Sequence, residues 1–163
     1  MATAREPDPA ELLRRLYLRP GFLLRRAHQL SVGIFEEECR DVGLTPSQFG
    51  VLIVLEQTGI SDQSTVARAL GFDRVTTLRV VRGLEARGLL RRVGAVELKG
   101  RRKLALTAAG RRAFTAGRVR AERISHRLLS PLQAGEQAQL LLLLRKLCAG
   151  LEDGARTRVV PPG

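Results

Sequence analysis

The chain has 163 residues, 44% of them hydrophobic, and carries 28 Lys and Arg against 16 Asp and Glu, a formal net charge of +12. This length and composition indicate one folded domain with a core and exclude a disordered chain. The longest apolar run, Leu140 to Leu144, is too short to span a bilayer. Two cysteines and an N-terminus unlike a signal peptide predict a cytoplasmic protein without a membrane partner.

The positive charge is concentrated in one part of the chain. Between Asp73 and Arg112 there are twelve basic and three acidic residues, so the other 123 residues carry only +3. Such clustering is typical of a protein that binds a polyanion. Nucleic acid is favoured over acidic lipid because no basic amphipathic membrane helix accompanies the charge.

The first part of the chain predicts two helices. Residues 1–10 contain prolines and small residues and predict a loose tail. Leucines at helical spacing predict a short helix over about residues 12–17, which ends at Pro20-Gly21. A longer helix is expected over about residues 22–40, and Gly43 ends it.

Helix caps define the next two elements. Thr45 with Pro46 and Gln48 predicts a helix start with a capping box, and this helix ends near Gly59. Ser61 or Asp62 caps a shorter helix, which Gly71-Phe72 terminates in a tight turn.

The helix that follows the turn has one apolar face and one cationic face. Asp73 is its expected N-cap, and Gly88 is placed to end it. Four residues would face the core: Thr77, Val80, Val81 and Leu84. The opposite side carries Arg74, Val75, Leu78, Arg79 and Arg82. A helix, a short turn and a second, basic helix indicate a helix-turn-helix whose second helix enters the major groove of DNA.

A β-hairpin and two helices complete the chain. Strands are predicted over about residues 89–93 and 103–106, with arginines at the connecting tip. Thr107 caps a long helix to about Leu129, and a last helix runs from about Ala134 to Leu151. The last helix is apolar over too wide an arc for one core, which predicts a second subunit against it. The polar residues 154–163 predict a disordered tail.

The ordered motifs resemble the MarR (multiple antibiotic resistance regulator) family of winged helix-turn-helix transcription factors. The resemblance covers roughly residues 20–150. It rests on Leu44 to Phe49, Val66 to Gly71, Arg82 to Leu89, and Leu104 to Gly110, that is, Leu-Glu-x-Arg-Gly-Leu before the wing and Leu-x-Leu-Thr-x-x-Gly after it. The family's wing usually carries Asp-x-Arg, whereas this chain has Gly100-Arg101-Arg102.

The resemblance implies a mainly α fold with a small β-wing, in a single domain over residues 1–163. The winged helix-turn-helix lobe would span about residues 44–110, and dimerisation helices about residues 11–40 and 108–151. The implied partner is double-stranded DNA, bound by a homodimer at a palindromic operator. The expected DNA contacts are Arg74, Val75, Thr76, Leu78, Arg79, Arg82, Arg101, Arg102 and Lys103.

The segment from Pro20 to Gln29 looks most like members of the family that sense aromatic acids or their thioesters. The resemblance therefore implies a repressor that a small phenolic or carboxylate effector releases from DNA. The expected effector contacts are Arg25, Arg26, His28, Phe22, Phe35 and Phe49. An arginine there would pair with a carboxylate through two parallel hydrogen bonds.

The sequence leaves two alternative functions open. Cys39 could act as a thiol-redox switch, although Glu36, Glu37 and Glu38 disfavour a thiolate. The protein could also be a constitutive architectural or RNA-binding winged helix, which the low aromatic content of 4% disfavours. An enzyme is not expected: the chain has two histidines, no metal-ligand spacing, no phosphate-binding glycine motif and no cofactor motif.

Overall fold

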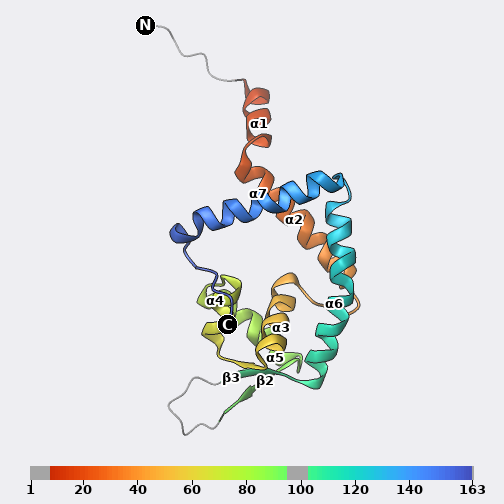
Figure 1. Ribbon diagram of the computed structural model, residues 1–163, viewed down its shortest axis with the longest axis vertical. Helices are drawn as coiled ribbons and strands as arrows, with labels where there is room; N and C mark the ends of the chain where they lie inside the picture. Colours follow the sequence, from red (N-terminus) through yellow and green to blue (C-terminus); the bar gives the residue numbers. More distant parts are fainter. Residues whose placement is uncertain (1–7, 95–102, 163) are drawn as a thin grey trace.

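The computed structural model describes residues 8–94 and 103–162 of the chain. Over these residues the fold is mainly helical, with one small sheet and a winged helix-turn-helix arrangement (Figure 1). The elements in chain order are α1 (Pro9–Tyr17), α2 (Pro20–Glu38), α3 (Pro46–Thr58), β1 (Ile60–Ser61), α4 (Gln63–Leu70), α5 (Arg74–Ala86), β2 (Leu90–Val93), β3 (Lys103–Leu106), α6 (Ala108–Leu129), α7 (Ala134–Leu151) and the 3₁₀ turn η1 (Glu152–Gly154). The mainly α prediction with a β-wing is confirmed.

Local side-chain caps fix the helix starts. The Thr45 side chain accepts from the Gln48 amide at 3.3 Å, and the Gln48 side chain accepts from the Thr45 amide at 3.2 Å. This reciprocal pair is the predicted capping box, with Pro46 in the first turn. Of the two candidates for the α4 cap, Asp62 is the one used, and it accepts from the Thr65 amide at 2.8 Å. α1 already begins at Pro9, so the predicted loose tail is too long by two residues in the described part.

The sheet contains one strand that the sequence does not reveal. Its order is β1-β3-β2, all antiparallel, with Ile60 opposite Ala105 and Arg91 also opposite Ala105. β2 and β3 form the predicted hairpin. β1 has two residues, too few to produce an alternating pattern, and it forms because the chain between α3 and α4 passes along the free edge of β3.

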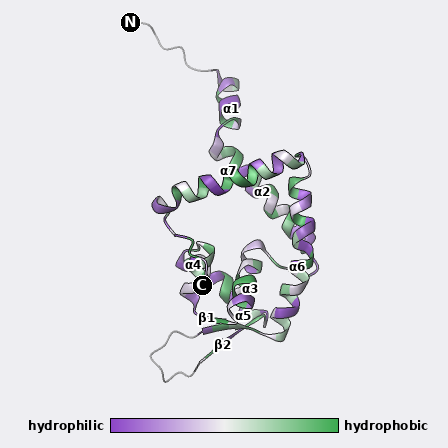
Figure 2. Cartoon of the chain, in the orientation of Figure 1, coloured by the Kyte–Doolittle hydropathy of each residue, from purple (hydrophilic) through white to green (hydrophobic). Residues whose placement is uncertain are grey.

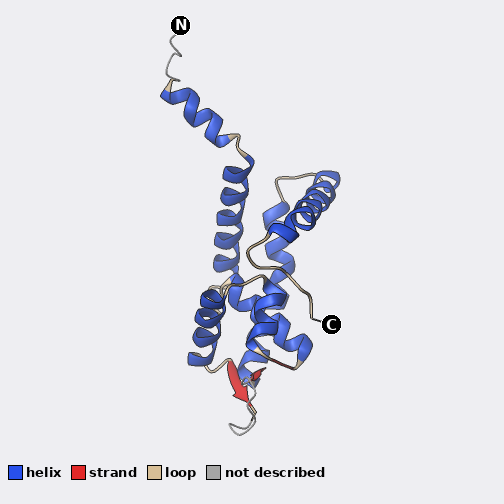
Figure 3. Cartoon of the chain, turned by 90° about the vertical axis from the view of Figure 1, so that its left-hand side faces the viewer, coloured by secondary structure: helices blue, strands red, loops and turns tan. Residues whose placement is uncertain are grey.

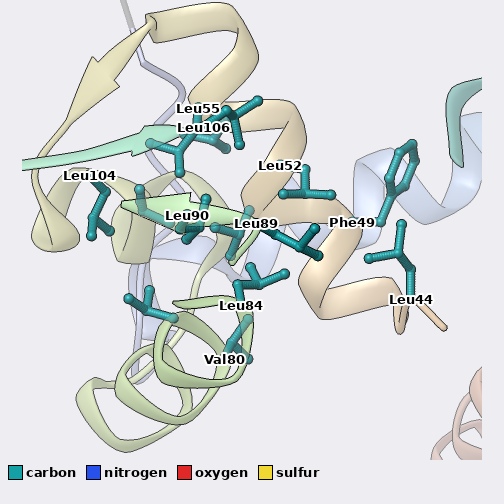
Figure 4. Close-up of a cluster of buried hydrophobic side chains, with 14 of the residues drawn as sticks. Leu44, Phe49, Leu52, Leu55, Val80, Leu84, Leu89, Leu90, Leu104 and Leu106 are labelled. Carbon is teal, nitrogen blue, oxygen red and sulfur yellow. The ribbon is translucent and has the colours of Figure 1, made fainter. Parts of the chain in front are cut away.

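The core lies where α3, α5 and the sheet meet (Figure 4). Leu52 and Leu55 from α3, Leu84 from α5 and Leu104 from β3 are almost completely buried there. A row of aromatic rings extends the core towards α6. Phe49 lies 5.8 Å from Phe35 and 6.2 Å from Phe114 between ring centroids. Burial of these side chains holds α2, α3 and α6 together.

Ion pairs add to the contact between the end of α2 and α6. Arg127 contacts Glu37 at 2.7 Å and Glu38 at 3.3 Å. Arg120 pairs with Asp41, and its Nε donates to the Glu38 carbonyl at 3.0 Å. The C-terminal end of α2 is therefore fixed to α6, whereas the N-terminal half of α2 is exposed.

The remaining helices extend from the core with much of their apolar surface uncovered. α7 has no buried residue, although hydrophobic side chains recur along it (Figure 2). In Figure 3, α1 and α2 run up one side of the molecule and α7 lies on the other. The exposed large apolar residues include Leu12, Leu13, Leu16, Leu23, Leu30, Leu141, Leu142, Leu143 and Leu147.

The C-terminal segment has a defined position. Residues 155–162 lead back from η1 towards α4, and the Val160 amide donates to the Arg68 carbonyl at 2.9 Å. This placement differs from the disordered tail that the polar composition predicts. The physical reason is that carbonyl groups at the end of a helix accept hydrogen bonds from a neighbouring segment, as the Arg68 carbonyl does here from Val160 in addition to Gly71.

Candidate nucleic-acid interface

The cationic face of α5 is exposed. The Asp73 carboxylate caps α5 by accepting from the Thr76 amide at 2.6 Å. This hydrogen bond is the main reason that the pKa of Asp73 is lower than usual. The four side chains predicted to face the core are buried, namely Thr77, Val80, Val81 and Leu84. The side chains of Arg74, Val75, Arg79 and Arg82 are exposed, and Thr76 and Leu78 are half-buried.

The arginines on this face are available to a partner. Among the described residues, Arg74, Arg79 and Arg82 make no ion pair with an acidic side chain. Unpaired guanidinium groups on one helix face can each donate to phosphate oxygens or to guanine edges. Val75, with 77% of its surface exposed, adds an apolar group between them.

A tight turn orients α5 relative to α4. Gly71 ends α4 with φ +64°, the left-handed conformation that glycine adopts without strain. The amide of Phe72 then donates to the Ala67 carbonyl at 2.9 Å. Phe72 is half-buried against the core. The helix-turn-helix predicted from Gly71 and Asp73 is therefore present.

A cationic hollow of about 720 Å³ lies beside the start of α5. Its walls come from α4, α5 and β2, and its lining residues are Gln63, Ser64, Ala67, Arg68, Arg74, Thr77 and Arg92. Arg68 and Arg74 bring positive charge to this hollow, whereas Arg92 is paired with Glu85 and the Asp62 carboxylate already caps the N-terminal turn of α4. Of the lining residues, only Arg74 was predicted to contact DNA. Gln63 and Ser64 could have been located from the sequence, because they directly follow the Asp62 N-cap and so begin α4.

The wing is described at its base. Lys103 is exposed at the start of β3, opposite Val93. Arg92 of β2 pairs with Glu85 of α5 at 2.7 Å, which connects the wing to the basic helix. The predicted wing contacts Arg101 and Arg102 lie outside the described residues.

The six predicted effector contacts separate into two groups within one chain. Phe35 and Phe49 are buried in the aromatic row of the core, together with Phe114, which sequence analysis did not select. Phe22 lies near the N-terminus of α2, where the Arg25 guanidinium stands 5.0 Å from its ring centroid. Thirteen residues of helix, about 20 Å, separate Phe22 from Phe35.

The polar members of that set are accessible. Arg26 and His28 are exposed on α2, near the group formed by Phe22 and Arg25. Tyr17 of α1 packs against Phe22 at 5.2 Å between ring centroids. An effector that used these residues together with the core aromatics would have to bridge the length of α2.

Cys39 is buried without exposed surface. Burial raises the pKa of its thiol, and this outweighs the opposing effect of the neighbouring Arg120 guanidinium. A sensor thiol needs access to oxidant and a lowered pKa, and Cys39 has neither. Cys148 is exposed on α7.

Residues 8–94 and 103–162 contain neither a metal-ligand cluster nor a membrane-spanning helix. No group of three or more His, Cys, Asp or Glu side chains is placed to hold a metal ion. No helix combines the length and hydropathy that crossing a membrane requires.

A tight helical turn, a basic second helix and a two-stranded wing define a winged helix-turn-helix DNA-binding protein. The MarR family model matches residues 42–102, which contain α4, the tight turn, α5 and the first wing strand β2. The HTH-type transcriptional repressor NicR of Pseudomonas putida is 35% identical over 129 residues, 78% of this chain and 80% of NicR. The chain belongs to the MarR family of DNA-binding transcriptional regulators.

Solved structures of two further proteins are similar over most of the chain. The PcaV transcriptional regulator from Streptomyces coelicolor is 34% identical, with a TM-score of 0.72 over 83% of this chain and 98% of PcaV. BpsR of Bordetella bronchiseptica is 32% identical, with a TM-score of 0.75 over 82% of this chain and 96% of BpsR. The BpsR structure concerns regulation of its DNA binding by 6-hydroxynicotinic acid.

Proposed function

We propose that this protein is a homodimeric repressor that binds a palindromic operator and is released by a small aromatic effector. The observation that carries the proposal is the exposed face of α5, where Arg74, Arg79 and Arg82 pair with no acidic side chain of residues 8–94 and 103–162 and lie on the same side as the exposed Val75. Such a surface is electrostatically unfavourable in isolation and matches the acceptors of a DNA major groove.

In this proposal different residues of α5 contact the bases and the phosphates of the DNA. Arg79, in the middle of the exposed face, pairs with guanine O6 and N7. Arg74, Thr76 and Arg82 bind phosphates or base edges, and Val75 and Leu78 contact thymine methyl groups. Arg101, Arg102 and Lys103 bring the wing to the DNA backbone. Most of the affinity comes from phosphate contacts and falls steeply with salt.

The exposed apolar surface supports the dimer. α7 buries no side chain within one chain, yet it carries a run of leucines, and α1 exposes Leu12, Leu13 and Leu16. Apolar surface on this scale is typical of a subunit interface. A two-fold dimer places two copies of α5 in successive major grooves, about 34 Å apart.

The effector class is proposed from the relatives and from the charge on α2. BpsR, whose DNA binding 6-hydroxynicotinic acid regulates, is similar over most of the chain. In this chain Arg25, Arg26 and His28 offer donors to a carboxylate or phenol beside the Phe22 ring. The effector would stabilise a dimer in which the two copies of α5 no longer match the grooves. Converting 99% bound to 99% released needs a differential affinity of about 5.5 kcal/mol.

The test of DNA recognition compares two arginine variants on two duplexes. Palindromes selected from random DNA by the wild-type protein and a random duplex of equal length serve as ligands. Arg79→Ala should weaken binding to the palindrome by about 1–3 kcal/mol and change binding to random DNA little. Arg40→Ala, which removes an exposed arginine outside α5, is the control. Equal losses on both duplexes would exclude base recognition by Arg79.

The test of the effector uses the same palindrome with a panel of aromatic acids that includes 6-hydroxynicotinic acid. Arg26→Ala should keep the DNA affinity and require more effector for release, because the carboxylate loses its cation. An unchanged dose response would remove Arg26 from the effector site. Release by peroxide and by no aromatic acid would contradict the aromatic effector and favour a thiol switch, although Cys39 is buried in this structure.

A further inference from the structure

The C-terminal segment, residues 155–162, connects the end of α7 with the helix-turn-helix. In Figure 1 this segment descends from the end of α7 to α4. The Thr157 hydroxyl donates to the Gly71 carbonyl at 2.6 Å, and the Val160 amide donates to the Arg68 carbonyl at 2.9 Å. The two acceptors belong to the last turn of α4 and to its C-cap, and the Arg68 carbonyl also accepts from the Gly71 amide at 3.3 Å. We call residues 155–162 the strap.

The strap is also fixed at its other end. The Val159 amide donates to the Glu152 carboxylate at 2.5 Å, and Arg158 pairs with Asp153 at 3.1 Å. Both carboxylates belong to η1, which continues directly from α7. A Cβ atom on Gly71 would lie 2.9 Å from the Val159 side chain, so the strap packs closely on the helix-turn-helix turn. The strap is therefore a direct connection between α7 and that turn.

The attachment matters because α7 has few other connections within the chain. At its first turn, Gln137 donates to the carbonyls of Leu129 and Leu132, which join α7 to the end of α6. No residue of α7 between these ends is buried. α7 thus connects to the rest of the chain mainly at two points, the loop after α6 and the strap.

The second attachment point lies directly before the DNA-recognition helix. Gly71 is two residues before Asp73, the N-cap of α5. Arg156 is exposed, and its charge makes a small contribution to the lowered pKa of Asp73, after the dominant hydrogen bonds from Thr76. A displacement of α7 would therefore be transmitted through the strap to the start of α5.

We infer that the strap positions the recognition helix relative to the dimer, with Thr157 and its bond to Gly71 as the main positioning contact. This inference rests on the proposed dimeric function, because α7 is the helix assigned to the subunit interface. With the strap attached, the spacing of the two α5 helices follows the geometry of the interface. Without it, α2 and α6 are the described elements that connect each helix-turn-helix lobe to the dimer.

The experiment uses the full chain and four variants. Truncation after Gly154 removes the strap, and Arg156→Gln controls for the positive charge nearest α5. Thr157→Val removes the hydroxyl donor at similar volume, and Thr157→Ser restores it. Dissociation constants are measured by fluorescence anisotropy on the selected palindrome, on the same palindrome with one base pair inserted at its centre, and on a random duplex.

Truncation should weaken binding to the palindrome at least tenfold more than Arg156→Gln does. On random DNA the two variants should differ only by the effect of one charge, because truncation removes Arg158 as well as Arg156. Thr157→Val should weaken palindrome binding about fivefold, the usual worth of one hydrogen bond, and Thr157→Ser should stay within about twofold of wild type. The truncated protein should also discriminate less between the two palindrome spacings, because a helix-turn-helix lobe that is not connected to α7 can adopt either spacing. If the strap contributed to stability alone, the ratio of the dissociation constants for the two palindrome spacings would not change.

Several results would overturn the inference. Truncation that matches Arg156→Gln on every duplex would mean that the strap contributes only charge. Equal losses on palindrome and random DNA would exclude positioning. If the truncated protein does not fold, the test is the comparison of Thr157→Val with Thr157→Ser. Identical dissociation constants of these two variants on the palindrome would refute the inference. A wild-type protein without preference for any palindrome would refute the proposed function itself, which separates the two failures.

Discussion

The packing of α6 against the start of the wing can be tested by adding one methyl group at Gly110, as the substitution Gly110→Ala does. Gly110 lies in the first turn of α6, in the Leu-x-Leu-Thr-x-x-Gly motif, and it is buried. A Cβ atom there would lie 2.1 Å from the carbonyl oxygen of Leu89. That oxygen cannot move freely, because it accepts from the Thr107 amide at 3.1 Å and from the Thr107 hydroxyl at 3.3 Å. Either α6 or the start of β2 must shift to admit an alanine.

Gly110→Ala sets this clash against the higher helix propensity of alanine. The propensity gain is at most about 1 kcal/mol. Overpacking costs about 1–3 kcal/mol and more where backbone must move. We expect a net loss of about 2 kcal/mol, which lowers the melting temperature by about 4–8 °C in a domain of this size.

The matched control is Gly83→Ala in α5. Its Cβ would meet only the Gln48 side-chain nitrogen at 3.6 Å, an ordinary contact. This variant should be as stable as wild type or up to about 1 kcal/mol more stable. Thermal unfolding is followed by circular dichroism at one protomer concentration, since a dimer's melting temperature depends on it. A Gly110→Ala protein that melts at or above the wild-type temperature would refute the packing argument.

Four further predictions concern separate features of the molecule. Arg87→Ala should lose about 1–2 kcal/mol in urea unfolding, because its guanidinium donates to two carbonyls of the α2–α3 connection at 2.7 and 2.8 Å; Arg87→Lys should not restore this loss. Asp62→Ala should cost about 1 kcal/mol at pH 7. Because hydrogen bonds from Ser64 and Thr65 lower the native pKa of Asp62, this difference should persist above about pH 4 and disappear as the pH falls through that lowered pKa. Cys39 should react with iodoacetamide at pH 8 far more slowly in native than in urea-unfolded protein, since burial raises the pKa of its thiol, and equal rates would contradict its burial. Leu142→Glu should shift sedimentation equilibrium from dimer to monomer, whereas an unchanged mass would place α7 outside the interface.

Local signals in the sequence were sufficient for most elements of the fold. The caps at Thr45, Asp73 and Thr107 each bond to a backbone amide three residues away, so their effect does not depend on distant residues. The apolar spacing in α5 similarly identified the buried and exposed faces of one helix. The exposed part of the candidate DNA site could therefore be predicted residue by residue, because a helix places its own side chains.

The tertiary structure decided what depends on segments far apart in the chain. β1 exists only as a partner of β3, and the hollow beside α5 needs Arg92 from the wing as well as Arg68 from α4. The family resemblance suggested Phe35 and Phe49 as candidate effector contacts, but only the packing shows that Phe49 lies between Phe35 and Phe114 in the core. The position of the strap is the clearest case. Its composition is that of a loose tail, and it is ordered by hydrogen bonds to carbonyl groups at the end of α4, where the acceptor Gly71 lies 86 residues before Thr157.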